Sequence, residues 1–263
     1  MLTGHFIASE QGQLFITQFG DITGDSAILC LPSITEEMNL ARAVVAKQAQ
    51  CFADENLPCF VLDYYGTGDS EGEFEQANTD IWLENIIAAG EFIQQQGVSN
   101  IILWGVRFGA LLMLNHQKTL HQQLPITQQI LWQPVTNGKL FLSQFLRIKQ
   151  AKNMMSNSAE KTNWREHVLQ GNDTEVAGYL LTKPMLQAIE SLKISQEFQP
   201  LSSLHWFELS VKEPTPLTKR LSASWDETLA SMHCFDCPRF WQVPEIFALP
   251  ELEQLTLRAV CVK

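Results

Sequence analysis

The sequence lacks any run of about 18 apolar residues, which is the length that a membrane-spanning helix needs. Its opening residues, MLTGHFIASE, also lack the basic segment and the continuous apolar segment of a secretory signal. Internal repeats and low-complexity tracts are missing as well. We therefore expect a cytoplasmic protein without a transmembrane segment.

Basic residues are few in this chain. There are 18 lysines and arginines against 29 aspartates and glutamates, which gives a formal net charge of -11. Proteins that bind nucleic acids need a positively charged surface to neutralise the phosphate backbone. We therefore expect no nucleic-acid partner, and the acidic balance also disfavours anionic membranes.

The six cysteines follow no disulfide or metal-binding pattern. In a chain of 263 residues without a secretory signal, they indicate reduced thiols. The segment HCFDCP contains His233, Cys234 and Cys237, but no second pair of cysteines accompanies it. We therefore predict no metal site and no cofactor.

Apolar strand-like segments alternate with amphipathic helix-like segments. This alternation predicts an α/β fold with a mostly parallel sheet and helices on both faces. A hairpin is expected over residues 5–20, because polar and apolar residues alternate on both sides of EQGQ. The expected strands cover residues 26–32, 58–64, 99–105, 126–134, 204–210 and 233–241, and the expected helices cover 34–56, 78–97, 110–120, 222–232 and 250–260.

The alternating pattern stops after Pro134. From Asn137 to about Pro200 the chain is mostly helical and amphipathic, with a polar break near residues 154–163. We therefore predict an α/β core made of residues 1–136 and 201–263. Residues 137–200 are predicted to form a helical insertion placed like a lid.

The segment LWGVRFGA, residues 103–110, has the spacing of a nucleophile elbow. In that turn a strand bends sharply into a helix, small residues flank the bend, and the central side chain projects above the sheet. Here the flanking residues are Gly105 and Gly109, and the central residue is Arg107. The backbone N–H of Phe108, the next residue, would form part of an oxyanion hole.

Two further segments agree with an α/β-hydrolase arrangement. DYYGTGDSEGEF places Asp63, Gly66, Gly68 and Ser70 in the D-x-x-G-x-G-x-S pattern that builds a turn in many α/β-hydrolases. LCLPSITEEMN lies where that fold has its oxyanion loop, with a second donor near Ile34. The chain thus resembles α/β-hydrolases over about residues 10–135 and 203–263, and the insertion falls where those proteins carry a lid.

Five blocks narrow this resemblance: TEEMNLAR, DYYGTGDSEGEF, LWGVRFGALL, WQPVTNGKLFLSQFLR and FWQVPEI. Together they resemble the second type of exosortase A system-associated hydrolase, which also has arginine in the elbow. Such proteins are encoded beside bacterial exosortase and exopolysaccharide systems. The resemblance therefore implies a bacterial protein whose partner is an exosortase-pathway or exopolysaccharide-pathway protein.

The residues for standard serine-hydrolase chemistry are missing. Arginine has five N–H donors, no acceptor and no accessible deprotonated form, so Arg107 cannot attack a carbonyl. The base should follow the last strand, but the residues there are CPRFW. The acid position offers only Glu208 or Glu213, and His205 is expected to be a core histidine. Ser33 is expected to cap a helix with Glu36, and Ser70 to belong to the turn.

Three hypotheses for Arg107 remain open from the sequence. The guanidinium forms an internal salt bridge to Glu36 or Glu37, or it binds an incoming anion at a helix N-terminus, or it serves an unusual reaction. Three functions are therefore considered. The first is a non-classical or inactive hydrolase that binds a small acidic ligand or a partner. The alternatives are an active hydrolase of esters, thioesters or peptides with a non-standard mechanism, and a protein-interaction scaffold. The candidate ligand-binding residues are Arg107, Phe108, Ile34, Glu36, Glu37, Asn39, Asp69, Gln133, Lys139, Trp206 and Trp241.

Overall fold

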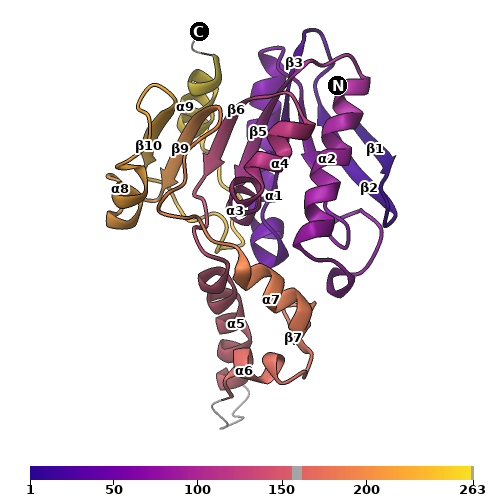
Figure 1. Cartoon of the computed structure of the whole chain (residues 1–263), viewed down its shortest axis with the longest axis vertical. Coiled ribbons are helices and arrows are strands. Elements are labelled where there is room, and N and C mark those ends of the chain that lie inside the picture. Colours follow the sequence, from indigo (N-terminus) through magenta and orange to yellow (C-terminus); the bar gives the residue numbers. More distant parts are fainter. Residues whose placement is uncertain (156–161, 262–263) are drawn as a thin grey trace.

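The computed structural model describes residues 1–155 and 162–261. Within them, eight strands form one sheet in the order β1-β2-β4-β3-β5-β6-β9-β10 (Figure 1). The pairs β1–β2 and β2–β4 are antiparallel and all other neighbours are parallel, which confirms the predicted hairpin and the mostly parallel sheet. The strands are β1 Leu2–Ala8, β2 Gln13–Phe19, β3 Ser26–Leu31, β4 Cys59–Leu62, β5 Asn100–Val106, β6 Ile126–Trp132, β9 Ser203–Leu209 and β10 Ala230–Phe235.

Helices cover both faces of the sheet, as predicted, and each face has its own apolar core. On one face α2 (Thr79–Gln95) and α3 (Phe108–Asn115) pack on a cluster that contains Trp82. On the other face α1 (Thr35–Asp54) and α9 (Pro250–Cys261) enclose a cluster that contains Trp132. The parallel strands are buried on both sides, which is why their sequences are continuous apolar runs.

The predicted helix over residues 110–120 divides into two. After α3, the chain continues as α4 (Gln117–Gln123), and His116 lies between the two helices. A short 3-10 helix, Phe74–Gln76, precedes α2. No helix among the described residues is both long enough and apolar enough to cross a membrane.

The segment between β6 and β9 extends away from the sheet, past the ends of its strands (Figure 1). It is mostly helical, as expected, but it also contains a small antiparallel hairpin that the sequence analysis missed. Part of the predicted polar break, residues 156–161, lies outside the described residues. The elements are α5 Gly138–Met155, α6 Trp164–Leu169, β7 Thr174–Val176, β8 Tyr179–Leu181 and α7 Lys183–Ser191.

Two predictions near the C-terminal end of the chain were wrong. Residues 222–232 do not form a helix; instead α8 covers Pro216–Ser222. The Thr215 side chain accepts a hydrogen bond from the Thr218 N–H and Pro216 occupies the first turn, so the helix start signals lie earlier than the apolar pattern suggested. β10 ends at Phe235, before Pro238, and the following residues form a loop instead of continuing the predicted strand.

Candidate functional site

Arg107 occupies a sharp turn between β5 and α3. Its backbone has φ 54° and ψ -112°, a conformation that L-residues rarely adopt and that stores about 1–3 kcal/mol of strain. The flanking glycines permit the turn: a Cβ on Gly105 would lie 2.6 Å from the Cα of Ala110, and one on Gly109 would lie 2.0 Å from the carbonyl oxygen of Leu31. Strand, turn and helix therefore have the geometry that the elbow pattern predicts.

The Arg107 guanidinium binds Glu37 on α1 in a bidentate ion pair. Nε donates to Oε2 at 3.1 Å and Nη2 donates to Oε1 at 2.7 Å. Nη1 donates to the backbone oxygen of Gln133 at 3.2 Å. The ring of Trp241 lies over the guanidinium, with its centroid 4.9 Å from the Cζ atom. Of the two acidic residues left open by the sequence, the partner is thus Glu37, and Glu36 makes no ion pair among the described residues.

Ser33, which precedes α1, connects this ion pair to the elbow backbone. Its hydroxyl donates to Glu37 Oε2 at 2.9 Å and accepts from the Phe108 N–H at 3.4 Å. The predicted capping box with Glu36 is wrong, because Ile34 is the N-cap residue and no side chain caps this helix. Ile34 is fully buried. The one elbow N–H that could stabilise an oxyanion is therefore already paired with a side chain.

A tryptophan takes the region where a catalytic base would be expected. Trp241, in the loop after β10, packs on Arg107. His205 on β9 points to the other face of the sheet from Trp206, because neighbouring strand residues alternate. Its Nδ1 contacts Ser231 Oγ at 2.8 Å, and Ser231 Oγ lies 3.0 Å from His233 Nε2. Burial and the nearby His233 lower the pKa of His205 to about 4.

The acid position is used structurally. Glu208 at the end of β9 is 4% exposed. Its carboxylate accepts hydrogen bonds from the Thr215 N–H at 2.8 Å and the Thr218 hydroxyl at 3.1 Å, which fixes the start of α8. Glu213, the other candidate, is exposed and pairs with Lys219 at 3.6 Å. Neither glutamate orients a base.

Arg107 also borders a cavity of about 200 Å³, which we call the inner cavity. It lies between α5 and the β9–α8 segment, and its polar wall residues include Gln133, Gln144 and Thr215. Trp206 forms part of the apolar wall and is 1% exposed. Arg107 is 7% exposed, so it borders the inner cavity with only a small part of its surface.

A wider groove adjoins the inner cavity. This outer groove has a volume of about 570 Å³ and is lined by Lys139 and Lys193. The two hollows share Thr136, Leu140 and Leu217 in their walls. A third hollow of about 480 Å³ lies between α1, α5 and the loop after β10, and we call it the acidic cleft. Its lining includes Glu36, Glu37, Phe141, Phe145 and Trp241.

The structure groups most of the predicted residues, but not all of them. Asn39 donates to the Tyr179 hydroxyl at 2.9 Å, and the Asp69 N–H donates to Asp63 at 3.0 Å. Neither residue lines the inner cavity, the outer groove or the acidic cleft. The bridging role of Ser33 was not predicted, because its spacing to Glu36 matches a helix-capping pattern.

Among the described residues, no group of three or more histidines, cysteines, aspartates or glutamates could hold a metal ion. The pair His233 and Cys234 lies on β10, and Cys237 is in the loop that follows. Burial raises the pKa values of both cysteines, which opposes the thiolate form that a metal would require.

No protein-family model matches the sequence, and a search of curated proteins gave no match. Solved structures do match over nearly the whole chain. A protein from Agrobacterium vitis with a provisional name as a hydrolase is 12% identical, with a TM-score of 0.68 over 99% of this chain and 98% of its own. The fold is that of the α/β-hydrolases.

Two other structures give the same result. Est1E from Butyrivibrio proteoclasticus, solved with ferulic acid, is 13% identical, with a TM-score of 0.64 over 98% of this chain and 100% of its own. Mouse alpha/beta hydrolase domain-containing protein 10 is 12% identical, with a TM-score of 0.62 over 98% and 96%. At such identities the likeness concerns the α/β-hydrolase fold alone.

Proposed function

We propose that this α/β-hydrolase-fold chain is a binding protein for a small acidic ligand, and that its elbow does not carry acyl transfer. The observation that supports this most is the position of Arg107, which pairs with Glu37 and also borders the inner cavity. A guanidinium at a helix N-terminus favours anions, and it can supply no nucleophile.

Donor geometry favours an acidic group in the inner cavity. The Arg107 guanidinium has five N–H donors, of which three have described partners on Glu37 and Gln133. The Glu208 carboxylate, which also lines the cavity, already accepts two hydrogen bonds. The remaining Arg107 N–H donors are the groups that an incoming carboxylate or phosphate would meet.

The outer groove supports the same ligand class. Lys139 and Lys193 line it, and no acidic side chain does. In a protein with a net charge of -11, such a positive path concentrates anions locally and speeds their association. Acidic sugars, nucleotide-sugar phosphates and peptide carboxylates all carry suitable groups.

Calorimetric titration with glucuronate, inorganic phosphate and an N-acetylated dipeptide tests the ligand class. At least one should bind the wild type, and Arg107→Ala should weaken it by about tenfold or more, as expected for a charge-assisted hydrogen bond. Lys139→Gln should slow association and reduce its salt dependence. Glucose serves as the uncharged control. Equal weak responses from the wild type and Arg107→Ala would contradict the proposal.

An ester and thioester panel tests the absence of acyl transfer. We expect no turnover above that of buffer, and no labelling by a fluorophosphonate probe, because the Phe108 N–H is paired and Arg107 cannot attack. Turnover that disappears in both Glu37→Gln and Arg107→Ala would instead establish a hydrolase with a non-standard mechanism. Labelling of Ser33 would identify a relocated nucleophile.

We also propose that the chain belongs to the second type of exosortase A system-associated hydrolases and has a partner in an exosortase or exopolysaccharide pathway. The five sequence blocks support this group. The described part of the insertion, residues 137–155 and 162–200, would then be the lid and a docking surface, which is supported by the exposure of Leu140 (50%), Ile148 (41%) and Met154 (70%) on α5. A photo-crosslinking residue at position 148 should capture a pathway protein in its own host, whereas crosslinking only to unrelated abundant proteins would argue against this surface.

A further inference from the structure

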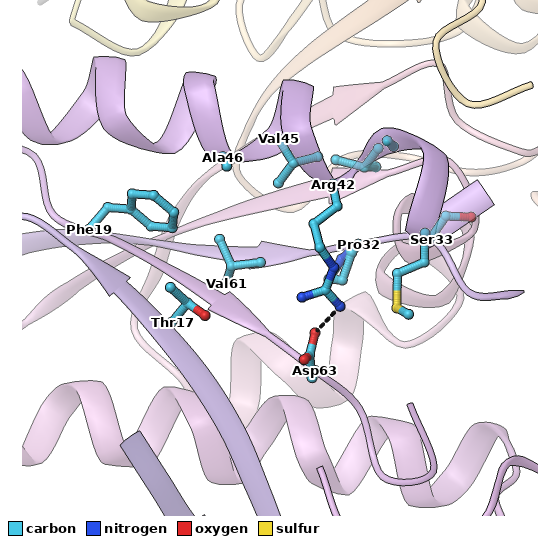
Figure 2. A pocket seen from close by; sticks show the side chains of 12 residues that line it. Thr17, Phe19, Pro32, Ser33, Arg42, Val45, Ala46, Val61 and Asp63 are labelled. Carbon is cyan, nitrogen blue, oxygen red and sulfur yellow. Dashed lines mark hydrogen bonds and ion pairs between the residues drawn. The ribbon is translucent and has the colours of Figure 1, made fainter. Parts of the chain in front are cut away.

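A separate apolar cavity of about 200 Å³ lies between α1 and the sheet (Figure 2). Its walls come from β2, β4 and the inward face of α1, with Val106 from the end of β5. The apolar lining includes Phe19, Val61, Met38, Ala41, Val45 and Ala46. Ser33 is the one residue of the elbow network that borders it, so the cavity is distinct from the inner cavity that Arg107 lines.

This apolar cavity has a polar end and an apolar end. Phe19 pairs with Cys59 at the start of β4, whereas Asp63 follows the end of that strand, so Phe19 and Asp63 lie at opposite ends of the cavity. Figure 2 shows Arg42 reaching toward Asp63, while Phe19 lies at the other end, beyond Val61. Arg42 Nη2 donates to Asp63 Oδ1 at 3.1 Å.

The two charged groups at the polar end differ in what they can still bind. The Asp63 side chain is 5% exposed, and its two oxygens accept from Arg42 and from the Asp69 N–H. The Arg42 side chain is 46% exposed, and one of its five N–H donors has a described partner. The polar end therefore offers hydrogen-bond donors and a positive charge, beside a carboxylate that is already satisfied.

We propose that this cavity binds an aliphatic carboxylate, with its chain among the apolar side chains and its carboxylate on the free donors of Arg42. An apolar cavity of about 150 Å³ accepts benzene, so a slightly larger one has room for a chain of roughly seven or eight carbon atoms. Pockets that combine apolar walls with a few polar groups at one end are typical small-molecule sites. The carboxylate fits Arg42 because charge-assisted, bidentate hydrogen bonds form readily with guanidinium.

Calorimetric titration of the full chain with octanoate tests this assignment. We expect a Kd on the order of 100 μM to 1 mM for a ligand of this size. Octanol and octylammonium should bind at least about tenfold more weakly, because neither offers a carboxylate to Arg42. Equal binding of octanol and octanoate would overturn the role of Arg42.

Two substitutions on α1 separate filling of the cavity from general damage. Ala46→Phe places a ring in the apolar end and should weaken octanoate binding by at least about tenfold. Ala43→Phe makes the same change at a half-buried position outside the cavity lining and should bind octanoate as the wild type does. Equal affinity in the two variants would place octanoate elsewhere. Thermal unfolding confirms that both variants are folded.

Arg42 can be tested without losing the partner of Asp63. Arg42→Lys keeps a positive charge near Asp63 but loses the planar pair of donors, so it should weaken octanoate binding by about threefold, whereas Arg42→Gln, which also loses the charge, should weaken it by about tenfold or more. Saturating glucuronate should leave octanoate binding unchanged, since the inner cavity and this cavity have different walls. Competition between the two ligands would refute a separate site, and octanoate binding does not depend on whether glucuronate binds at all.

Discussion

Substitution of Glu37 by glutamine tests the Arg107–Glu37 ion pair most directly. The side chain of Arg107 is 8% exposed and that of Glu37 is 15% exposed, so the change would leave a charged guanidinium buried without its counter-ion. Removing one partner of a buried ion pair destabilises a protein by about 3–5 kcal/mol. Because the glutamine oxygen can still accept one hydrogen bond, and because the pair is not fully buried, we expect the free energy of unfolding to fall by about 2–4 kcal/mol.

Urea unfolding at pH 7, followed by circular dichroism and tryptophan fluorescence, measures this change. Glu36→Gln is the matched control, since it removes a charge from the same helix turn without breaking a described ion pair. It should lower the free energy of unfolding by about 0.3–1 kcal/mol, because the carboxylate no longer complements the helix dipole. A double-mutant cycle with Arg107→Met should give a coupling energy of at least about 2 kcal/mol. If Glu37→Gln and Glu36→Gln are equally stable, or if the cycle is additive, the ion pair does not stabilise the fold.

Three further changes test other parts of the structure. Gly109→Ala should lower the free energy of unfolding by about 3 kcal/mol or more, because its Cβ would overlap a backbone oxygen. Gly24→Ala is the control: its Cβ meets nothing within 4 Å, so it should change the free energy of unfolding by less than about 0.5 kcal/mol. Similar urea midpoints for the two variants would contradict the close packing at Gly109. The pKa of His205 is lowered to about 4, so the unfolded chain takes up this proton first as pH falls below about 6.5, and the wild type should lose stability between pH 6.5 and 4. His205→Gln should reduce this loss of stability by about 1 kcal/mol in total, a modest value because the ring is only half-buried, and an unchanged loss would show that other groups cause it. Trp132→Phe removes the 3.1 Å hydrogen bond to the Thr256 hydroxyl and part of a fully buried ring, so thermal unfolding should show a loss of about 1–3 kcal/mol.

Much of the fold could be predicted because buried parallel strands and covering helices leave strong periodic patterns. The strands ending near Leu31 and Val106 are continuous apolar runs, and the glycines around Arg107 mark a turn that tolerates no side chain there. The helix predicted over residues 222–232 failed because its apolar spacing competed with the start signals at Thr215 and Pro216. Local capping chemistry outweighed periodicity at that point.

The candidate site could be predicted only in part. The sequence placed Arg107 in the elbow and named Glu36 and Glu37 as partners, but only the register of α1 decides which carboxylate faces the guanidinium. The position of Trp241 depends on a loop without a regular pattern, so its packing on Arg107 had no sequence signal. Pairings across 70 or more residues follow from the assembled fold and not from local spacing.

The hydrogen bond between the Phe108 N–H and Ser33 means that this elbow differs from a serine elbow by more than one side chain. Placing serine at position 107 would not by itself produce an esterase. The oxyanion donor would still be held by Ser33, Glu37 would lose its counter-ion, and Trp241 would still occupy the region expected for a base. At least three positions would have to change together, and the loss of the Glu37 counter-ion would lower stability before any activity appeared. The arginine elbow is thus one part of a coupled set of contacts, and a single substitution at position 107 cannot convert it.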